Sequence, residues 1–345
     1  MILSRDTLNR KILARYAAAR SRAENDLARR REMLLESSPE LQTIEADLAR
    51  ARGTWLAAKA AGHDPTEAEA GLDAIRESRD TWLRARGLNL DDDVPEYECS
   101  HCGDRGVIDL VAHTSATGYT LASGTCPHCW GNTAAPLIQA AGQLQYVRNC
   151  NFADFDVTLF STAAQGRAME ALRQALELSA DNFAVEGRDW LFHGLPGTGK
   201  TFMAGSLANA LAERGLYALY MTATGFNEIF EEYRLMRRMF QPDPVRLEQA
   251  EEAYAGIHTA DLLIIDDLGT ESPYFQSRLA DLSATLQSRE QHGLRTIITT
   301  NLSVADLGRT YDERLVSRIM GRFEPVPFRG EDLRLVLRRK GRTDV

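Results

Sequence analysis

The sequence predicts an α/β core built on a parallel sheet, preceded by an all-helical region and a short segment with paired cysteines. In the C-terminal half, apolar runs such as residues 262–265 and 296–298 are bounded by polar residues and alternate with helical segments. Runs of this kind are typical of strands that are buried on both faces of a parallel sheet. Residues 1 to about 88 are instead rich in Ala, Arg, Glu and Leu, which favour helices.

The composition is that of an ordinary globular protein with two or three domains, since the 345 residues are 44% hydrophobic and 26% charged. The formal net charge of -9 excludes a strongly cationic DNA-coating protein, although it leaves room for a local basic groove. No apolar run predicts a membrane span, and the N-terminus lacks the apolar stretch of a signal peptide. We expect a cytoplasmic protein without a membrane partner, with domains over residues 1–90, 91–135 and 136–345.

Two helix starts can be recognised in the N-terminal region. Ser38 and Pro39 form a cap followed by proline at the first helical position, and residues 64–67 place an acidic residue three positions after a cap. Apolar residues then recur at helical spacing, which predicts a helical hairpin or a small bundle. Two interpretations stay open: a packed helical domain with a solvated charged face, or a module that docks a partner protein.

The second region contains two Cys-x-x-Cys pairs, each closely followed by a glycine: Cys99 with Cys102, and Cys126 with Cys129. Two such knuckles can place four thiolates around one Zn²⁺ in a closed tetrahedral site, and the β-type residues between them suit a short ribbon hairpin. His101 or His128 could replace a cysteine, although four thiolates already complete the shell. We expect a structural rather than a catalytic zinc, and we expect the separate Cys150 to be a small core residue.

The most informative segment is GLPGTGKT, which matches a phosphate-binding loop and follows a strand-like run. Glycines let the loop turn its backbone N–H groups toward phosphate, and the helix that follows directs its positive dipole end at the same anion. Lys200 is expected to reach the β- and γ-phosphates, and Thr201 is expected to bind Mg²⁺. The predicted nucleotide-binding residues of this segment are Gly194, Pro196, Gly197, Thr198, Gly199, Lys200, Thr201 and Phe202.

Polar side chains follow two further predicted strands. The run at residues 262–265 ends in Asp266 and Asp267, and the run at residues 296–300 ends in Asn301. We expect Asp266 to hold Mg²⁺ and Asp267 to polarise the attacking water, while Asn301 lies between that water and the γ-phosphate.

Downstream, Arg314 and Arg318 are four residues apart, which places them on one face of a predicted helix. An arginine that completes the nucleotide site of a neighbouring subunit must lie on such an exposed face. An ordinary solvated basic helix is the alternative.

Together these motifs resemble the AAA+ ATPase domain of bacterial helicase loaders of the DnaC/DnaI type and the related IstB-like transposition ATPases. The matching segments within residues 151–334 are NFADFD, GLPGTGKT, LLIIDDLGTE, TTN, ERLVSRI and EDLR. LLIIDDLG is the specific one, because most AAA+ proteins have aspartate followed by glutamate there. The paired cysteines resemble DnaI-like and phage-encoded loaders, whereas IstB-like proteins usually lack them. The resemblance implies a five-stranded parallel sheet and a helical lid that is short or absent.

The resemblance also implies roles for single residues. Arg318 is the favoured arginine finger, with Arg314 as the second candidate, and Arg334 matches the second sensor arginine. Phe152 and Phe155 fall near the adenine. Residues 222–239 match an extra helix of these loaders, where basic and aromatic side chains suit single-stranded DNA or, alternatively, form an ordinary amphipathic surface helix. The side chains concerned are Arg234, Arg237, Arg238, Phe226 and Tyr233.

The resulting prediction is an ATPase, with ATP, Mg²⁺ and Zn²⁺ as cofactors, that loads a hexameric replicative DNA helicase onto single-stranded DNA. The resemblance implies self-association through the ATPase domain and a bacterial protein, with a phage or mobile-element origin also open. One alternative is an IstB-like ATPase that binds DNA and recruits a transposase. Another is a binding module in which the nucleotide only gates a scaffold.

Overall fold

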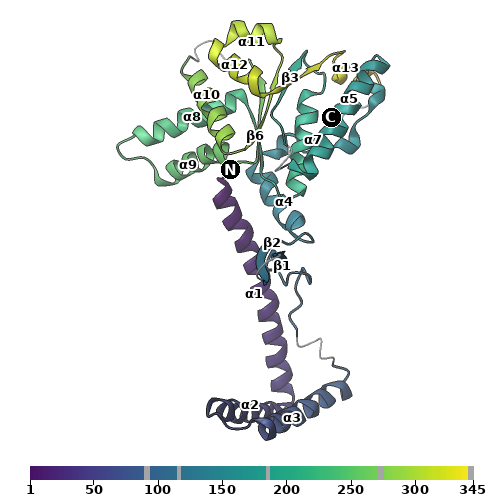
Figure 1. The fold of residues 1–345 in the computed structure, drawn as a ribbon, viewed down its shortest axis with the longest axis vertical. Helices are drawn as coiled ribbons and strands as arrows, with labels where there is room; N and C mark the ends of the chain where they lie inside the picture. Colours follow the sequence, from purple (N-terminus) through teal and green to yellow (C-terminus); the bar gives the residue numbers. More distant parts are fainter. Residues whose placement is uncertain (89–93, 115–117, 184–186, 270–275, 341–345) are drawn as a thin grey trace. The chain divides into compact units, whose positions relative to one another are not determined.

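The fold was analysed in a computed structural model that describes residues 1–88, 94–114, 118–183, 187–269 and 276–340 (Figure 1). The chain divides into two compact units, one formed by Met1–Ile12 with Pro127–Val345 and the other by Leu13–Cys126. These boundaries differ from those of the three domains expected from the sequence. Among the described residues, no helix has both the length and the apolar character needed to cross a bilayer.

The N-terminal region is helical, as predicted, with α1 (Arg5–Ser37), α2 (Pro39–Ala60) and α3 (Thr66–Ala85). Pro39 does occupy the first turn of α2, but the side chain of Ser38 makes no capping hydrogen bond. Before α3, the carboxylate of Asp64 accepts a hydrogen bond from the backbone of Thr66 at 3.1 Å. α2 and α3 pack side by side and are joined by a hydrogen bond from the Trp82 indole to the Glu40 carboxylate at 2.8 Å (Figure 1).

The predicted ribbon hairpin is present. β1 (Val107–Thr114) pairs antiparallel with β2 (Gly118–Thr125), and Val107 lies opposite Thr125. The turn before β1 needs glycine at position 106, because φ there is +69° and a Cβ atom would lie 2.7 Å from the ring of Tyr16 on α1. The lower part of α1 therefore packs tightly against the ribbon within this unit.

The other unit is built on a five-stranded parallel sheet, which confirms the predicted fold class. The strand order is β4 (Ala218–Thr222), β5 (Leu262–Leu268), β6 (Arg295–Thr300), β3 (Trp190–Gly194) and β7 (Glu324–Phe328). The first four residues of β5 are fully buried, as expected of a strand covered on both faces. In such a sheet, functional groups collect at the carboxyl ends of the strands.

Helices cover this sheet (Figure 1). In chain order they are α4 (Trp130–Ala141), α5 (Ala163–Asp181), α7 (Lys200–Glu213), α8 (Ala223–Arg238), α9 (Pro244–Thr259), α10 (Gln276–Gln291), α11 (Val304–Thr310), α12 (Glu313–Arg322) and α13 (Leu333–Arg339). Three short 3₁₀ turns lie between α4 and α5: η2 (Leu144–Tyr146), η3 (Phe152–Asp154) and η4 (Val157–Leu159). Only the single helix α13 is described after β7, in agreement with a lid that is short or absent.

Both edges of the sheet are protected against pairing with another chain. Pro325 and Pro327 alternate along β7 and remove N–H groups from its outer side. At the opposite edge, the N–H of Tyr220 on β4 donates to the carbonyl of Gly142 at 2.8 Å. The parallel sheet therefore ends at these two strands.

The amino ends of the strands hold a buried cluster of charged groups that the sequence analysis did not find. Arg289 is fully buried, and its guanidinium donates to Thr296 and to the carbonyls of Ile257 and Ala260. Burial lowers the pKa of Arg289 to about 9. Beside it, Arg322 pairs with Asp189 at 2.5 Å. These charges tie α10 and α12 to the sheet at the end opposite the phosphate loop, so we regard them as structural.

Candidate nucleotide-binding site

The predicted phosphate loop connects β3 to α7, and its glycines are required by the backbone. Gly194 has φ +135°, and a Cβ atom there would lie 2.0 Å from the carbonyl oxygen of Phe328 on β7. Gly197 and Gly199 also have positive φ, of +73° and +96°. α7 starts directly after the loop, so its N-terminal N–H groups face the space that the loop encloses.

Lys200 is the first residue of α7 and lies almost completely buried inside the loop. Its ammonium group donates three hydrogen bonds of 2.8 Å, to the carbonyls of Gly194 and Leu195 and to the side-chain oxygen of Asn301. Burial lowers the pKa of Lys200, although the nearby Asp267 and Asp266 oppose that shift. A bound phosphate would offer this cation a stronger acceptor than the loop carbonyls do.

Asp266 lies at the carboxyl end of β5 and connects three other elements of the site. Its carboxylate accepts hydrogen bonds from Thr299 on β6 at 2.5 Å and from Tyr220 on β4 at 2.7 Å. The hydroxyl of Thr201 is 3.1 Å from both carboxylate oxygens. Hydroxyl and carboxylate oxygens are the ligands that Mg²⁺ prefers, so Thr201 and Asp266 have the chemistry and the proximity needed to hold it.

Asp267 adopts a left-handed backbone conformation with φ +57°, which is uncommon for a residue with a side chain. A strand irregularity between Ile265 and Leu268 allows this turn, and the N–H of Asp267 donates to Thr299 at 3.0 Å. The Asn301 amide donates to the Asp267 carboxylate at 3.3 Å. Burial, followed by the charge of Asp266, raises the pKa of Asp267. A carboxylate with a raised pKa is a better proton acceptor.

The start of α13 also reaches the phosphate loop, where the N–H of Leu333 donates to the carbonyl of Gly197 at 2.8 Å. A Cβ atom at Gly197 would lie 2.0 Å from the carboxylate of Asp332, so this residue covers the loop closely. Arg334 is exposed and pairs with Asp332 at 3.1 Å. The structure therefore brings Arg334 near the loop, but holds it on an acidic neighbour that the sequence analysis did not consider.

The two phenylalanines expected near the adenine differ in exposure. Phe152 is buried in the turn η3, whereas Phe155 is half-buried and its ring centroid lies 5.8 Å from that of Phe160. Asn151 caps η3 by accepting the N–H of Ala153 at 3.0 Å. Phe152 is thus a core residue of this segment, and only Phe155 presents part of its ring to the surface.

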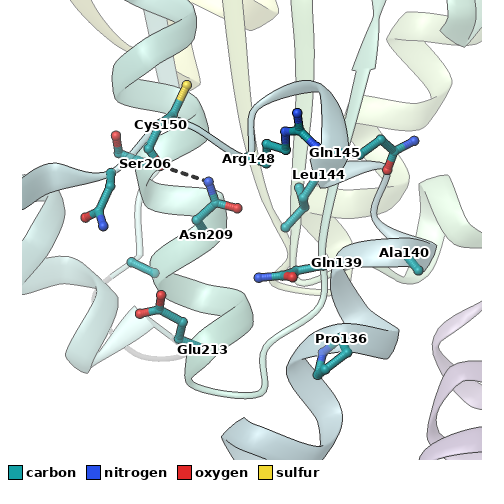
Figure 2. A pocket seen from close by; sticks show the side chains of 12 residues that line it. Pro136, Gln139, Ala140, Leu144, Gln145, Arg148, Cys150, Ser206, Asn209 and Glu213 are labelled. Carbon is teal, nitrogen blue, oxygen red and sulfur yellow. Dashed lines mark hydrogen bonds between the residues drawn. The ribbon is translucent and has the colours of Figure 1, made fainter. Parts of the chain in front are cut away.

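A cavity of about 470 Å³ lies between α7 and the segment that contains α4 and η2. Figure 2 shows Asn209 of α7 pointing toward this segment, and its amide donates to the carbonyls of Val147 and Cys150 at 2.8 Å. Burial raises the pKa of the Cys150 thiol to about 11. A thiol of this kind stays protonated and uncharged, which agrees with the prediction that Cys150 is a packing residue.

The arginines of α12 differ from one another in their contacts. Arg314 is exposed at the start of the helix. Arg318, one turn later, is partly exposed and donates to the Gln287 side chain on α10 at 3.3 Å. Arg322 is almost buried and belongs to the cluster at the amino ends of the strands. The face that carries Arg314 and Arg318 is therefore available to a neighbouring molecule, whereas Arg322 is not.

The structure contains the extra helix α8, but it leaves few of the proposed DNA-binding side chains free. Phe226 is buried, and Tyr233 stacks on Tyr254 of α9 with the ring centroids 4.1 Å apart. Arg234 pairs with Asp281, and Arg237 pairs with Glu251. Only Arg238 is exposed without such a pairing in the part of the chain that the structure describes. The expectation that Phe226 stacks on a base is thus wrong, because the apolar face of α8 packs on the core.

The predicted cysteine site is present as a compact cluster. The sulfur atoms of Cys99, Cys102, Cys126 and Cys129 all lie within 4.8 Å of one another, and Cys99 and Cys126 are 4.0 Å apart. Four ligands about 2.3 Å from a tetrahedral zinc would have sulfur atoms at similar separations. Asp104 shapes the first knuckle by accepting the N–H of Cys99 at 2.7 Å. The cluster therefore fits one Zn²⁺ bound by four thiolates.

We predict about one equivalent of zinc per chain, and its loss when Cys99 or Cys126 is replaced by serine, because a closed four-thiolate site tolerates no missing ligand. Atomic emission spectroscopy measures the metal, and limited proteolysis reports local unfolding of the ribbon. Cys150→Ser is the matched control and should retain the zinc. Full metal content in the Cys99→Ser protein would contradict this assignment.

Tyr220, Thr299 and Asp332 are the residues of this site that the sequence analysis missed. Thr299 lies within the TTN segment, so its position next to Asn301 could have suggested it. Tyr220 and Asp332 reach the site only through the packing of other elements. Thr270 and Glu271, the last residues of the LLIIDDLGTE segment, lie outside the described residues.

Comparison with known proteins agrees with this site. Residues 141–341 match the family model of IstB-like ATP binding proteins. The chain is 26% identical over 174 residues to the replicative helicase loader DnaC of Escherichia coli strain K12, covering 50% of this chain and 63% of that protein. It is 27% identical over 169 residues to the replicative helicase loader DnaI of Bacillus subtilis strain 168, covering 46% of this chain and 51% of that protein. The chain therefore spans less than two thirds of the length of either relative.

Two solved structures have similar folds. The crystal structure of the DnaC helicase loader has a TM-score of 0.42 and 24% identity, covering 54% of this chain and 99% of that one. The crystal structure of DnaI has a TM-score of 0.42 and 19% identity, covering 54% and 94%. Because the family model matches more than half of the chain and includes the whole phosphate-loop site, this protein is a member of the family of IstB-like ATP binding proteins.

Proposed function

We propose that the protein is an ATPase that loads a ring-shaped replicative helicase onto single-stranded DNA. The observation that carries the ATPase part is the convergence of Lys200, Asp266, Asp267 and Asn301 at the carboxyl ends of adjacent strands. The similarity of the ATPase region to DnaC and DnaI supports the loading part.

In this proposal the loop residues from Gly194 to Thr201 hold the phosphates of ATP, and Lys200 gives up its loop carbonyls for the β- and γ-phosphates. Thr201 and Asp266 hold Mg²⁺, which neutralises phosphate charge when bound. The raised pKa of Asp267 suits it to accept hydrogen bonds from the attacking water and to draw off its proton. Asn301 already connects Lys200 to Asp267 and would keep both groups oriented toward the γ-phosphate.

The remaining charge would be supplied by arginines. Arg334 has to leave Asp332 to reach the nucleotide of its own subunit. Arg318, or Arg314 beside it, lies on an exposed helix face and would reach the ATP of an adjacent subunit, so hydrolysis requires self-association. ATP binding would thereby assemble the subunits, and hydrolysis would release them. Residues 1–90 are proposed to dock the helicase, and residues 91–135 to form the zinc ribbon that precedes the ATPase domain, residues 136–345.

A surface for single-stranded DNA is proposed at the end of α8 rather than along it. Phe240 is 96% exposed directly after this helix, and the exposed residues Arg238 and Met239 precede it. An exposed ring beside a guanidinium offers a base a stacking surface and offers a phosphate a cation. These residues therefore replace Phe226 and Tyr233 as the proposed stacking groups.

We predict that Phe240→Ala weakens ATP-dependent binding of single-stranded DNA about five- to tenfold, because one base loses its stacking partner, an interaction worth about 1–3 kcal/mol. Fluorescence anisotropy of a labelled oligonucleotide measures the affinity. Phe240→Trp keeps an aromatic ring and should bind as the wild type does. Equal affinity of the alanine variant and the wild type would move the DNA surface elsewhere.

The experiment that tests the function combines the full-length protein with the purified hexameric replicative helicase of the same host, with ATP and Mg²⁺. Co-elution in size-exclusion chromatography, and transfer of the helicase to circular single-stranded DNA, are the expected results. The absence of both would contradict the loader proposal.

An IstB-like role with a transposase is the second candidate, and the family membership favours it. The cysteine cluster favours the loader, because it resembles DnaI-like proteins. Binding of a transposase encoded beside this gene, with no binding of the helicase, would decide for the second candidate.

A further inference from the structure

We propose that Tyr220 is a positioning residue for the carboxylate of Asp266, and that its hydroxyl sets the affinity of the site for the magnesium–nucleotide complex. This inference rests on the proposed function, in which Asp266 holds the metal. Tyr220 lies on β4, which contributes no residue to the motifs of the phosphate loop or of the strands that end in Asp267 and Asn301.

The contact is direct and shielded from water. The hydroxyl of Tyr220 donates to one carboxylate oxygen of Asp266 at 2.7 Å, and the two residues are only 7% and 3% exposed. The other oxygen accepts the hydroxyl of Thr299 at 2.5 Å. The carboxylate is therefore held from β4 on one side and from β6 on the other, with Thr201 equally distant from both oxygens.

Tyr220 itself has little freedom to move. In the parallel ladder it lies opposite Ile264 of β5, and on the other side its N–H donates to the carbonyl of Gly142 at 2.8 Å. Because the backbone is bonded on both sides, the ring delivers its hydroxyl to one place. The hydroxyl is thus in position before any ligand arrives.

The energetic consequence concerns the ionised carboxylate. A buried carboxylate oxygen that loses its donor costs about 1–3 kcal/mol, and this cost can be relieved by protonation or by rotation away from the site. Both responses remove the oriented anion that a magnesium ion requires. The hydroxyl of Tyr220 therefore favours the form of Asp266 that binds the cation.

The test is the Mg²⁺ dependence of nucleotide binding, measured with a fluorescent, non-hydrolysable ATP analogue on the full-length protein. Tyr220→Phe keeps the ring and removes only the hydroxyl. We expect the Mg²⁺ concentration at half-maximal binding to rise about tenfold, which corresponds to about 1.4 kcal/mol. Replacement of Tyr220 by 4-aminophenylalanine restores a donor at the same ring position and should return the midpoint toward that of the wild type.

Tyr217→Phe is the matched control. This residue is also buried, but its hydroxyl donates to the carbonyl of Leu3 at 2.8 Å rather than to Asp266. We expect no change in the Mg²⁺ midpoint for this variant. Thermal unfolding without Mg²⁺ shows whether the two phenylalanine variants are equally folded, so a general loss of stability is recognised separately.

The outcomes distinguish this inference from the function on which it rests. Wild-type protein that binds the analogue equally with and without Mg²⁺ would contradict both. A magnesium-dependent wild type whose midpoint is shared by Tyr220→Phe would contradict the role of Tyr220 alone. A shift that 4-aminophenylalanine does not reverse would show that the ring environment, and not the donor, causes it.

Discussion

Replacing Lys200 with alanine is expected to lower ATP hydrolysis by a factor on the order of a hundred to a thousand. The structure supplies the reason, since Lys200 is the buried cation inside the phosphate loop and already bonds the loop carbonyls and Asn301. Without it, the charge of the β- and γ-phosphates is not offset from this side. ATP-dependent assembly should weaken as well, because the site would no longer hold the nucleotide tightly. Phosphate release and binding of a fluorescent ATP analogue measure the two effects.

Lys59→Ala is the control for the simple loss of a lysine, because Lys59 lies on α2, over the ring of Trp55. That variant should hydrolyse ATP as the wild type does. Near-normal turnover in Lys200→Ala would remove the central assignment of the site, whatever the behaviour of the control.

The second large effect is expected at Arg318. If this arginine completes the site of an adjacent subunit, Arg318→Ala should bind ATP almost normally and hydrolyse it about a thousandfold more slowly. Mixing this variant with Lys200→Ala should then restore part of the activity. In such mixtures an intact phosphate loop on one subunit meets an intact Arg318 on its neighbour, as steady-state phosphate release would show.

Arg314→Ala provides the comparison, since Arg314 lies one turn away on the same exposed face while Arg318 also contacts Gln287. If Arg314→Ala is the slower variant and is the one rescued by mixing, the finger is Arg314. Mixed assemblies that form without any recovery of hydrolysis for either arginine would refute the intersubunit mechanism.

Much of the site could be predicted from the sequence because its groups lie next to one another along the chain or at strand ends. Glycines at positive φ and the lysine after them form one continuous loop, which a local pattern describes completely. Asp266, Asp267 and Asn301 each end a buried apolar run, and parallel strands bring their carboxyl ends to one edge of the sheet. The cysteine pairs are likewise local, and they converge in one cluster.

The side chains of α8 show where a local pattern is not sufficient. Its basic and aromatic residues could equally suit a DNA surface or an amphipathic helix, because the sequence does not say which face meets the core. Packing on α9 buries Phe226 and stacks Tyr233 on Tyr254, while Phe240, after the helix end, is left exposed. Which aromatic side chain can meet a base is therefore a property of the packed structure.

The sequence by itself determined the α/β class, the phosphate loop, the two aspartates and the cysteine cluster, because each depends on residues that are neighbours in the chain or share one repeating strand pattern. Only the tertiary structure decided that Tyr220 holds Asp266, that Asp332 retains Arg334 beside the loop, and that Arg322 is buried while Arg318 is accessible. These contacts join elements that are distant in the chain, and they depend on strand order and helix packing. No local pattern of side chains specifies such a choice, because it follows from how the elements fill space together.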